Sequence, residues 1–192
     1  MKVGLFFGSF NPVHFGHLII AESMLQLAEL DEVWLIVSPQ NPFKEKKDLL
    51  DHHHRLEMVN VATHNNLRVN GSDVEFGLPI PSYTIDTMRF LDKEYPNHEF
   101  AIMIGEDNLA GLNKWKDSEA LLRDYPFFVY PRINSNPVDF ADYPETVKQV
   151  DAPIVGISST QIRRRIKAGF SIRYWVVDEV RQIIEERGYY QD

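Results

Sequence analysis

The sequence predicts an α/β protein built on a doubly wound parallel sheet. Short, almost entirely apolar runs recur along the chain, and stretches with the apolar spacing of helices separate them. The strands of a parallel sheet are covered on both faces, so they read as continuous apolar runs and not as alternating ones. With 192 residues, of which 44% are hydrophobic, the chain has enough material for one domain with a substantial core.

The N-terminal part reads as a strand, a helix and a second strand. Residues 3–7 form the first apolar run, and residues 33–37 form the next one. Between them, from about residue 17 to residue 30, apolar residues recur on one helical face. Two strands joined by a helix make a βαβ unit, which places both strands parallel in one sheet.

The same alternation continues to the C-terminus. Further strands are expected near residues 67–70, 100–104, 127–130 and 154–157, and further helices at 51–64, from Ser82 to before Pro96, from 117 or 118 to before Pro126, at 158–168 and at 178–187. Ser82 is the expected N-cap of its helix, and Gly169 and Gly188 stand where the last two helices should end. Residues 134–153 are rich in Pro, Asp and Asn, which predicts a surface loop.

Composition and charge exclude several classes of protein. The chain has no cysteine, so a disulfide framework, a zinc–thiolate site and a cysteine nucleophile are ruled out. The 28 acidic residues exceed the 20 Lys and Arg residues, and the net charge of −8 argues against non-specific binding to nucleic acid or to an anionic membrane. No segment approaches the roughly 20 apolar residues of a membrane span. We therefore expect a cytoplasmic protein, because the sequence also shows no secretory leader pattern.

Basic residues gather in two places, which indicates a small polyanionic ligand. One cluster is Lys44, Lys46 and Lys47, and the other lies within residues 163–167. In open α/β sheets, ligands bind beyond the carboxyl ends of the strands. The candidate residues are therefore sought in the segments after predicted strands, namely residues 8–17, 39–47, 105–115 and 158–165.

The segment after the first strand combines glycines, a hydroxyl group and two histidines. Gly8 allows a sharp turn and a close approach of ligand to backbone, and Ser9 adds a hydroxyl group. His14 and His17, three residues apart at the start of a helix, would lie on one side, where free N–H groups and the helix dipole favour an anion. We predict that both imidazoles donate hydrogen bonds to a phosphate.

Residues 158–165 predict a second phosphate-binding helix start. Ser158 and Gln161 have the spacing of a capping box, which marks a helix N-terminus with exposed N–H donors. The hydroxyl groups of Ser158 and Ser159, with the guanidinium of Arg163 one turn further, would complete a site for a triphosphate tail.

Both segments resemble signatures of one enzyme superfamily. Gly8-x-Phe10-x-Pro12-x-His14-x-Gly16-His17 is similar to the signature of the HxGH nucleotidyltransferases, and residues 157–163 are similar to their ISSTxIR segment. Members join a nucleoside monophosphate from ATP to a phosphate-bearing acceptor and release pyrophosphate. The resemblance implies a Rossmann-like nucleotidyltransferase fold in a single domain over residues 1–192, with helices from about residue 158 closing the ATP site.

The middle of the chain resembles the bacterial nicotinate-nucleotide adenylyltransferase family. The matching segments are residues 42–44, 54–58, 81–87 and 104–107, followed by Trp115. The resemblance implies ATP and nicotinate mononucleotide as substrates, with Thr84 and Trp115 flanking the nicotinate ring. It also implies an ATP-binding set made of Gly8, Ser9, Phe10, Lys44, Gly105, Asp107, Ser158 and Ser159, in which Asp107 and the Gly105 backbone hold adenosine or ribose groups.

The chain departs from the family pattern at three positions. Many relatives have Thr where Ser9 stands and Asp where Asn11 stands, and the first change keeps the hydroxyl group. Several relatives have an aromatic residue at the position of Gly111. The second wall of the pyridine pocket is therefore not identified by the sequence.

The predicted reaction is direct adenylyl transfer, in which the mononucleotide phosphate attacks the α-phosphorus of ATP and pyrophosphate leaves. The predicted catalytic residues are His14, His17 and Arg163, with the two imidazoles on the α-phosphate and Arg163 on the leaving pyrophosphate. Lys44 is expected to contact phosphate as well. Mg²⁺ is the expected cofactor, carried with ATP, because the sequence shows no clustered carboxylates for it.

Other functions stay open at this stage. The acceptor could be nicotinamide mononucleotide or phosphopantetheine, although the phosphopantetheine branch usually carries Thr where His14 stands. A non-catalytic nucleotide-binding module is disfavoured by the intact His14, His17 and Arg163. No metal site is expected at residues 52–54, because three consecutive histidines point in three directions around a helix. The sequence leaves open whether the chain forms a homo-oligomer.

Overall fold

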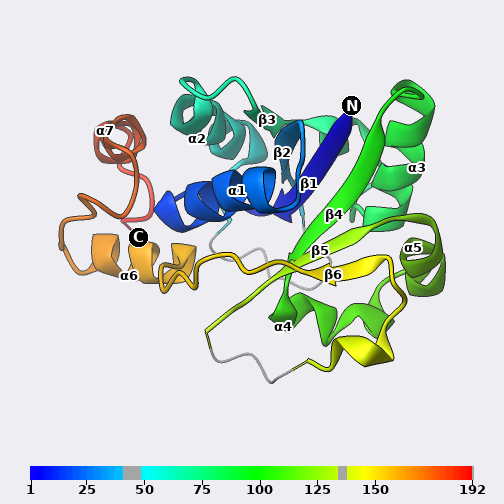
Figure 1. Cartoon of the computed structure of the whole chain (residues 1–192). Helices are drawn as coiled ribbons and strands as arrows, with labels where there is room; N and C mark the ends of the chain where they lie inside the picture. The colour runs from blue at the N-terminus through cyan, green and yellow to red at the C-terminus, as the bar shows by residue number, and fades with distance from the viewer. Residues whose placement is uncertain (41–48, 134–137, 192) are drawn as a thin grey trace.

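The computed structural model describes residues 1–40, 49–133 and 138–191. Its centre is one six-stranded sheet in the order β3-β2-β1-β4-β5-β6, with every neighbouring pair parallel (Figure 1). The strands are β1 (Lys2–Gly8), β2 (Glu32–Val37), β3 (Val69–Ser72), β4 (Glu99–Gly105), β5 (Phe127–Tyr130) and β6 (Val147–Gln149). The strand order reverses between β1 and β4, the switch point of a doubly wound sheet. The predicted fold class is confirmed.

Helices cover both faces of the sheet and enclose two apolar cores (Figure 1). On one side lie α1 (Phe15–Leu27), α2 (His52–Thr63), α6 (Ser159–Lys167) and α7 (Asp178–Glu186), and on the other side α3 (Thr84–Glu94) and α5 (Ser118–Asp124). Four short elements complete the described chain, namely α4 (Glu106–Leu109), η1 (Val74–Gly77), η2 (Leu112–Lys114) and η3 (Phe140–Asp142). Neighbouring strand residues point to opposite faces, so Leu5 belongs to one core and Phe6 to the other. Within the described ranges, the chain has no helix with both the length and the apolar character of a bilayer span.

The prediction of a strand at residues 154–157 is wrong. The last strand of the sheet, β6, lies instead within residues 134–153, which were expected to form a loop. The strand β6 is a short edge strand in which only Val147 is buried, so it lacks the continuous apolar run of an inner strand. The apolar side chains of Val155 and Ile157 line a cavity and do not join the sheet.

Two predicted element starts are also shifted. The strand β3 begins at Val69 and not at Leu67, whose side chain is 89% exposed. The N-cap of α3 is Tyr83 and not Ser82, because the Ser82 hydroxyl donates to Oε2 of Glu75 at 2.7 Å.

The helix ends near the C-terminus agree with the sequence. Ser158 is the N-cap of α6 and forms the predicted capping box with Gln161. Gly169 and Gly188 both have positive φ, at 71° and 63°, as the predicted residues after helices α6 and α7.

Candidate active site

Two adjoining cavities lie at the carboxyl ends of the central strands. The larger has a volume of about 710 Å³ and the smaller of about 320 Å³. Five residues line both cavities, namely Phe6, Phe7, Gly8, Asn108 and Tyr130. The two cavities therefore meet beside the ends of β1 and β5, where ligands of doubly wound sheets bind.

The larger cavity brings the two ends of the chain together. His14, His17 and Arg163 line it, as do Ser9, Phe10, Ser158 and Ser159. Two hydrogen bonds fix α6 against the loop after β1: Ser159 Oγ donates to the carbonyl of Pro12 at 2.9 Å, and Arg163 Nη1 donates to the carbonyl of Asn11 at 2.9 Å. The predicted histidines and the predicted arginine thus share one cavity.

The two histidines form a stacked pair at the start of α1. His14 is the N-cap and His17 the third helical residue, with ring centroids 3.7 Å apart. The backbone N–H of His14 donates to Nδ1 of His17 at 3.3 Å, so we assign the proton of the neutral His17 ring to Nε2. Burial, helped by the nearby Arg132, lowers the pKa of His14 to about 4. At neutral pH, His14 therefore contributes hydrogen bonding and no positive charge.

Glycine at position 16 permits this stacking. A Cβ at Gly16 would lie 2.9 Å from Nδ1 of His14, which is closer than side-chain atoms approach one another. The expected sharp turn at Gly8 is wrong in its position. Gly8 is the last residue of β1, and the left-handed backbone occurs two residues later at Phe10, with φ of 46°.

Arg132 is a candidate site residue that the sequence analysis missed. It lies two residues beyond the end of β5 and lines the larger cavity. Its Nε lies 3.6 Å from Oδ1 of Asp107, and its guanidinium lies 6.0 Å from the centre of the Tyr130 ring. The rule that ligands bind beyond strand ends identifies Arg132 once it is applied to the strand predicted at residues 127–130.

The larger cavity has the electrostatic character of a polyanion site. In the part of the chain that the structure describes, Arg132 and Arg163 line it and no Asp or Glu does. The helix α6 also begins at its wall, because Ser158, Ser159 and Thr160 are lining residues. Backbone N–H groups of a helix start and guanidinium groups are the usual protein donors to phosphates.

The smaller cavity holds the residues predicted for the pyridine ring. Thr84, the first residue of α3, and Trp115, which follows η2, both line it, as does Tyr83. Gly111 lines it too, and a Cβ there would meet only the carbonyl of Asn108, at 3.7 Å. Position 111 therefore leaves open space at the wall of the smaller cavity.

A buried carboxylate holds the start of α3 beside this cavity. Glu75, of which 2% is exposed, accepts hydrogen bonds from Ser82 Oγ at 2.7 Å and Thr87 Oγ1 at 2.8 Å. Since Thr84 lies between these two donors in the sequence, Glu75 fixes the position of Thr84 at the cavity wall.

Two described members of the predicted ATP-binding set do not line the larger cavity. Asp107 lines the smaller cavity and not the larger one. Gly105, the last residue of β4, is not a lining residue of either cavity, and a Cβ there would lie 2.7 Å from Cγ of Arg132. Lys44 lies outside the described residues.

No protein-built metal centre is found over residues 1–40, 49–133 and 138–191, where no group of three or more His, Cys, Asp or Glu side chains could hold an ion. Since the described lining of the larger cavity also lacks carboxylates, a divalent cation there would depend on phosphate oxygens for its ligands.

Comparison with known proteins gives the family. The cytidylyltransferase-like family model matches residues 5–165. A Cytophaga hutchinsonii protein named "probable nicotinate-nucleotide adenylyltransferase" is 48% identical over 192 residues, which cover 100% of both chains. A Flavobacterium johnsoniae protein of the same name is 46% identical over 193 residues, again covering 100% of both. The chain belongs to the nicotinate-nucleotide adenylyltransferase family.

Solved structures of nicotinate-nucleotide adenylyltransferases share the fold. A Plasmodium falciparum nicotinic acid mononucleotide adenylyltransferase complexed with NaAD superposes with a TM-score of 0.83 at 19% identity, covering 98% of this chain and 97% of that one. The resemblance that the two signature segments carry is therefore confirmed, and so is the Rossmann-like nucleotidyltransferase fold.

Proposed function

We propose that this chain transfers the adenylyl group of ATP to nicotinate mononucleotide, giving deamido-NAD and pyrophosphate in NAD biosynthesis. The observation that carries the proposal is the junction of two unlike cavities: His14, His17 and Arg163 line one, and Thr84 and Trp115 line the other. A phosphate-binding cavity beside an aromatic cavity suits a reaction that joins a triphosphate to a ring-bearing nucleotide. Two relatives that match this chain over their whole length and are named probable nicotinate-nucleotide adenylyltransferase support this assignment.

In this mechanism the chain positions two phosphates for in-line attack. An ionised oxygen of the mononucleotide phosphate forms a bond to the α-phosphorus of ATP, while the bond between the α-phosphorus and the bridging oxygen of pyrophosphate breaks. The attacking phosphate is already deprotonated, so no general base and no covalent enzyme intermediate are required. Catalysis comes from positioning and from stabilisation of charge.

The two histidines and Arg163 bind different phosphates of ATP. The Nε2–H of His17 donates to the α-phosphate as charge builds up in the transition state, and the neutral His14 ring, which stacks on His17, hydrogen-bonds the same phosphate. Arg163 and the N-terminus of α6, with Ser158 and Ser159, bind the departing pyrophosphate. Ser9 and the backbone around Gly8 and Phe10 complete the ATP side.

The substrate would be MgATP, in which a magnesium ion held by the phosphate oxygens would neutralise part of their charge. The smaller cavity takes the nicotinate ring between Thr84 and Trp115, and Asp107 accepts hydrogen bonds from ribose hydroxyl groups in the same cavity. We further propose that residues 1–192 act as one cytoplasmic domain on small nucleotides and not on nucleic acid. In that domain α6 and α7 cover the ATP site, and the hydrogen bond from Ser159 Oγ to the carbonyl of Pro12 supports this role for α6.

Pyrophosphate release from ATP tests this function. Nicotinate mononucleotide, nicotinamide mononucleotide and phosphopantetheine are compared as acceptors at equal concentration. We expect nicotinate mononucleotide to give the highest kcat/KM and phosphopantetheine to give none. A higher kcat/KM with nicotinamide mononucleotide would change the assigned acceptor, and absence of release with all three would leave a non-catalytic module.

A further inference from the structure

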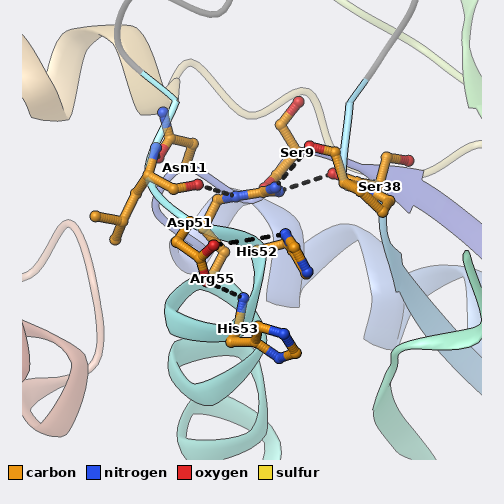
Figure 2. Close-up of polar contacts among 9 residues, drawn as sticks. Ser9, Asn11, Ser38, Asp51, His52, His53 and Arg55 are labelled. Atoms are coloured by element: carbon orange, nitrogen blue, oxygen red, sulfur yellow. Dashed lines mark hydrogen bonds and ion pairs between the residues drawn. The ribbon is translucent and has the colours of Figure 1, made fainter. Parts of the chain in front are cut away.

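Arg55 is a fully buried arginine that hydrogen-bonds the carbonyl of Ser9, a lining residue of the larger cavity. It lies on α2, with 0% of its side chain exposed. Among the described residues, four backbone carbonyls accept hydrogen bonds from its side chain, as Figure 2 shows in part. They are Leu50 O, 2.7 Å from Nε, Ser38 O, 3.0 Å from Nη1, Pro39 O, 3.2 Å from Nη2, and Ser9 O, which also accepts from Nη1.

The hydrogen bonds of Arg55 join segments that are distant in the sequence. Ser9 follows β1 and Ser38 follows β2, so one guanidinium holds the carboxyl ends of two neighbouring strands together. Burial lowers the pKa of Arg55 to about 10, while Tyr190 and Asp51 favour the charged form. Arg55 is therefore still positively charged at neutral pH, when it donates to these carbonyls.

Arg55 acts on both neighbours of Phe10, whose φ of 46° is unfavourable for a bulky side chain. On one side it binds the carbonyl of Ser9 directly. On the other side it binds the carbonyl of Leu50, while the N–H of Leu50 donates to Oδ1 of Asn11 at 3.2 Å. Arg55 thus restrains the residues on both sides of Phe10, and the hydroxyl group of Tyr190 adds a hydrogen bond to Oδ1 of Asn11 at 2.8 Å.

The orientation of one peptide group follows from these contacts. The bond between Ser9 and Phe10 is trans, so its carbonyl and N–H point in opposite directions. Since the carbonyl of Ser9 faces Arg55, the N–H of Phe10 faces away from Arg55, and Phe10 lines the larger cavity. Asn11 in turn accepts from Arg163 through its own carbonyl, at 2.9 Å.

We propose that Arg55 is a positioning residue for adenylyl transfer, which holds the backbone of residues 9–11 in the shape that receives the phosphates of ATP. It touches no substrate and acts through Ser9, Phe10 and Asn11. This inference rests on the function proposed above for its account of catalysis, but its prediction about phosphate binding does not depend on which acceptor is used.

The test uses Arg55→Lys with Arg68→Lys as the matched control. Lysine keeps the charge but lacks the planar fork that reaches several carbonyls at once. Arg68 also donates to backbone carbonyls, those of Leu30 and Asp31, but it does so at the opposite end of β2, away from both cavities. Both variants are compared with the wild type for unfolding in urea, for kcat and KM with each substrate, and for the Kd of inorganic pyrophosphate.

We expect Arg55→Lys to lower kcat/KM for ATP at least 30-fold and to weaken pyrophosphate binding about tenfold, with KM for nicotinate mononucleotide changed less than threefold. Arg68→Lys should keep all of these within threefold even where it loses comparable stability. Unchanged pyrophosphate affinity in a folded Arg55→Lys variant would overturn the proposal. So would equal losses of activity and affinity in both variants.

A measurement on the wild-type protein keeps the inference testable if Arg55→Lys does not fold. With ¹⁵N-labelled phenylalanine, the amide signal of Phe10 should shift on addition of inorganic pyrophosphate, because its N–H faces away from Arg55. A Phe10 signal that does not respond at saturating pyrophosphate would contradict the proposal. If pyrophosphate binds as expected but no acceptor is adenylylated, the proposed function fails and the role of Arg55 in phosphate binding stands.

Discussion

The two cavities at the centre of the molecule differ in charge and in the way the chain builds them. The described lining of the larger one contains two arginines, two histidines and no carboxylate, and two helix starts border it. The smaller one contains carboxylates and lysines in equal number, together with Tyr83 and Trp115. This difference supports the proposal that the two substrates bind in separate places, which meet beside Gly8.

His17→Ala should have the largest effect of the variants at the larger cavity. The variant removes the Nε2–H donor from the charged cavity, so we expect kcat to fall about 10²–10³-fold while the Kd of ATP changes only a few-fold. Single-turnover kinetics and calorimetry measure the two quantities. His64→Ala, at an exposed histidine after α2, is the control. Comparable losses in kcat and in ATP affinity would show that His17 acts in ground-state binding.

The buried His14 makes the charged cavity sensitive to acid. Its folded pKa of about 4 lies below the ordinary histidine pKa of 6.5, so the unfolded chain binds more protons between these values. Stability should therefore rise with pH across this window and be lost as the pH falls, by up to about 3 kcal/mol for this group. Urea unfolding of the wild type and of His14→Asn, which cannot titrate, isolates the contribution. Parallel pH profiles would contradict it.

Arg163→Gln tests whether Arg163 binds ATP and not the acceptor. Loss of a charge-assisted contact should raise KM for ATP roughly 10–100-fold, with KM for nicotinate mononucleotide nearly unchanged. Arg164→Gln, one residue further and exposed, should leave both constants unchanged. An equal rise of both KM values in Arg163→Gln would mean that this arginine does not distinguish the two substrates.

Trp115→Ala should weaken binding of nicotinate mononucleotide and not of ATP, the opposite of Arg163→Gln. Stacking of a ring on an aromatic side chain contributes about 1–3 kcal/mol, so we expect KM for nicotinate mononucleotide to rise about tenfold and the Kd of ATP to stay within twofold. The same preparation provides both values, which makes ATP binding the internal control. Weaker ATP binding would place the adenine ring, and not the nicotinate ring, against Trp115.

Gly111→Tyr should have the smallest effect, a modest decrease of KM for nicotinate mononucleotide. The backbone at Gly111 has φ of −104°, and a Cβ there would meet only the carbonyl of Asn108, at 3.7 Å. An added aromatic wall should lower KM for nicotinate mononucleotide about threefold. Gly111→Ala, which adds the Cβ without the ring, should leave KM unchanged. An increased KM for Gly111→Tyr would show that Trp115 and Tyr83 already fill the pocket.

The same two regions differ in how far the sequence predicts them. The charged cavity is built largely from two continuous segments after strands, where helix-start chemistry is visible in the order of residues. His14, His17 and Arg163 were predicted on that basis, and the structure places them in one cavity. Arg132 was missed because a single arginine after a strand forms no local pattern.

The smaller cavity depends on tertiary packing. Thr84 and Trp115 were predicted from family resemblance, and nothing in their local spacing indicates that they meet. Glu75 belongs to a 3₁₀ turn that was not predicted, and its partners Ser82 and Thr87 become visible only in the folded chain. Ser82 was therefore interpreted as a helix cap, which is the ordinary role of serine before a helix.

In the sheet, too, the sequence predicts the inner strands better than the edge strand β6. Inner strands such as β1 and β4 were predicted at nearly their observed bounds because burial on both faces requires continuous apolar residues. The edge strand β6 escapes this rule, and the apolar residues after it serve the cavity instead.

A crystal structure of the chain with bound deamido-NAD tests most directly whether the two cavities divide the substrates. We predict that the nicotinate ring contacts Trp115 in the smaller cavity and that the phosphate bridge lies at the junction, within hydrogen-bond distance of Nε2 of His17. A dinucleotide lying wholly in the larger cavity, with its nicotinate ring away from Trp115, would contradict this division.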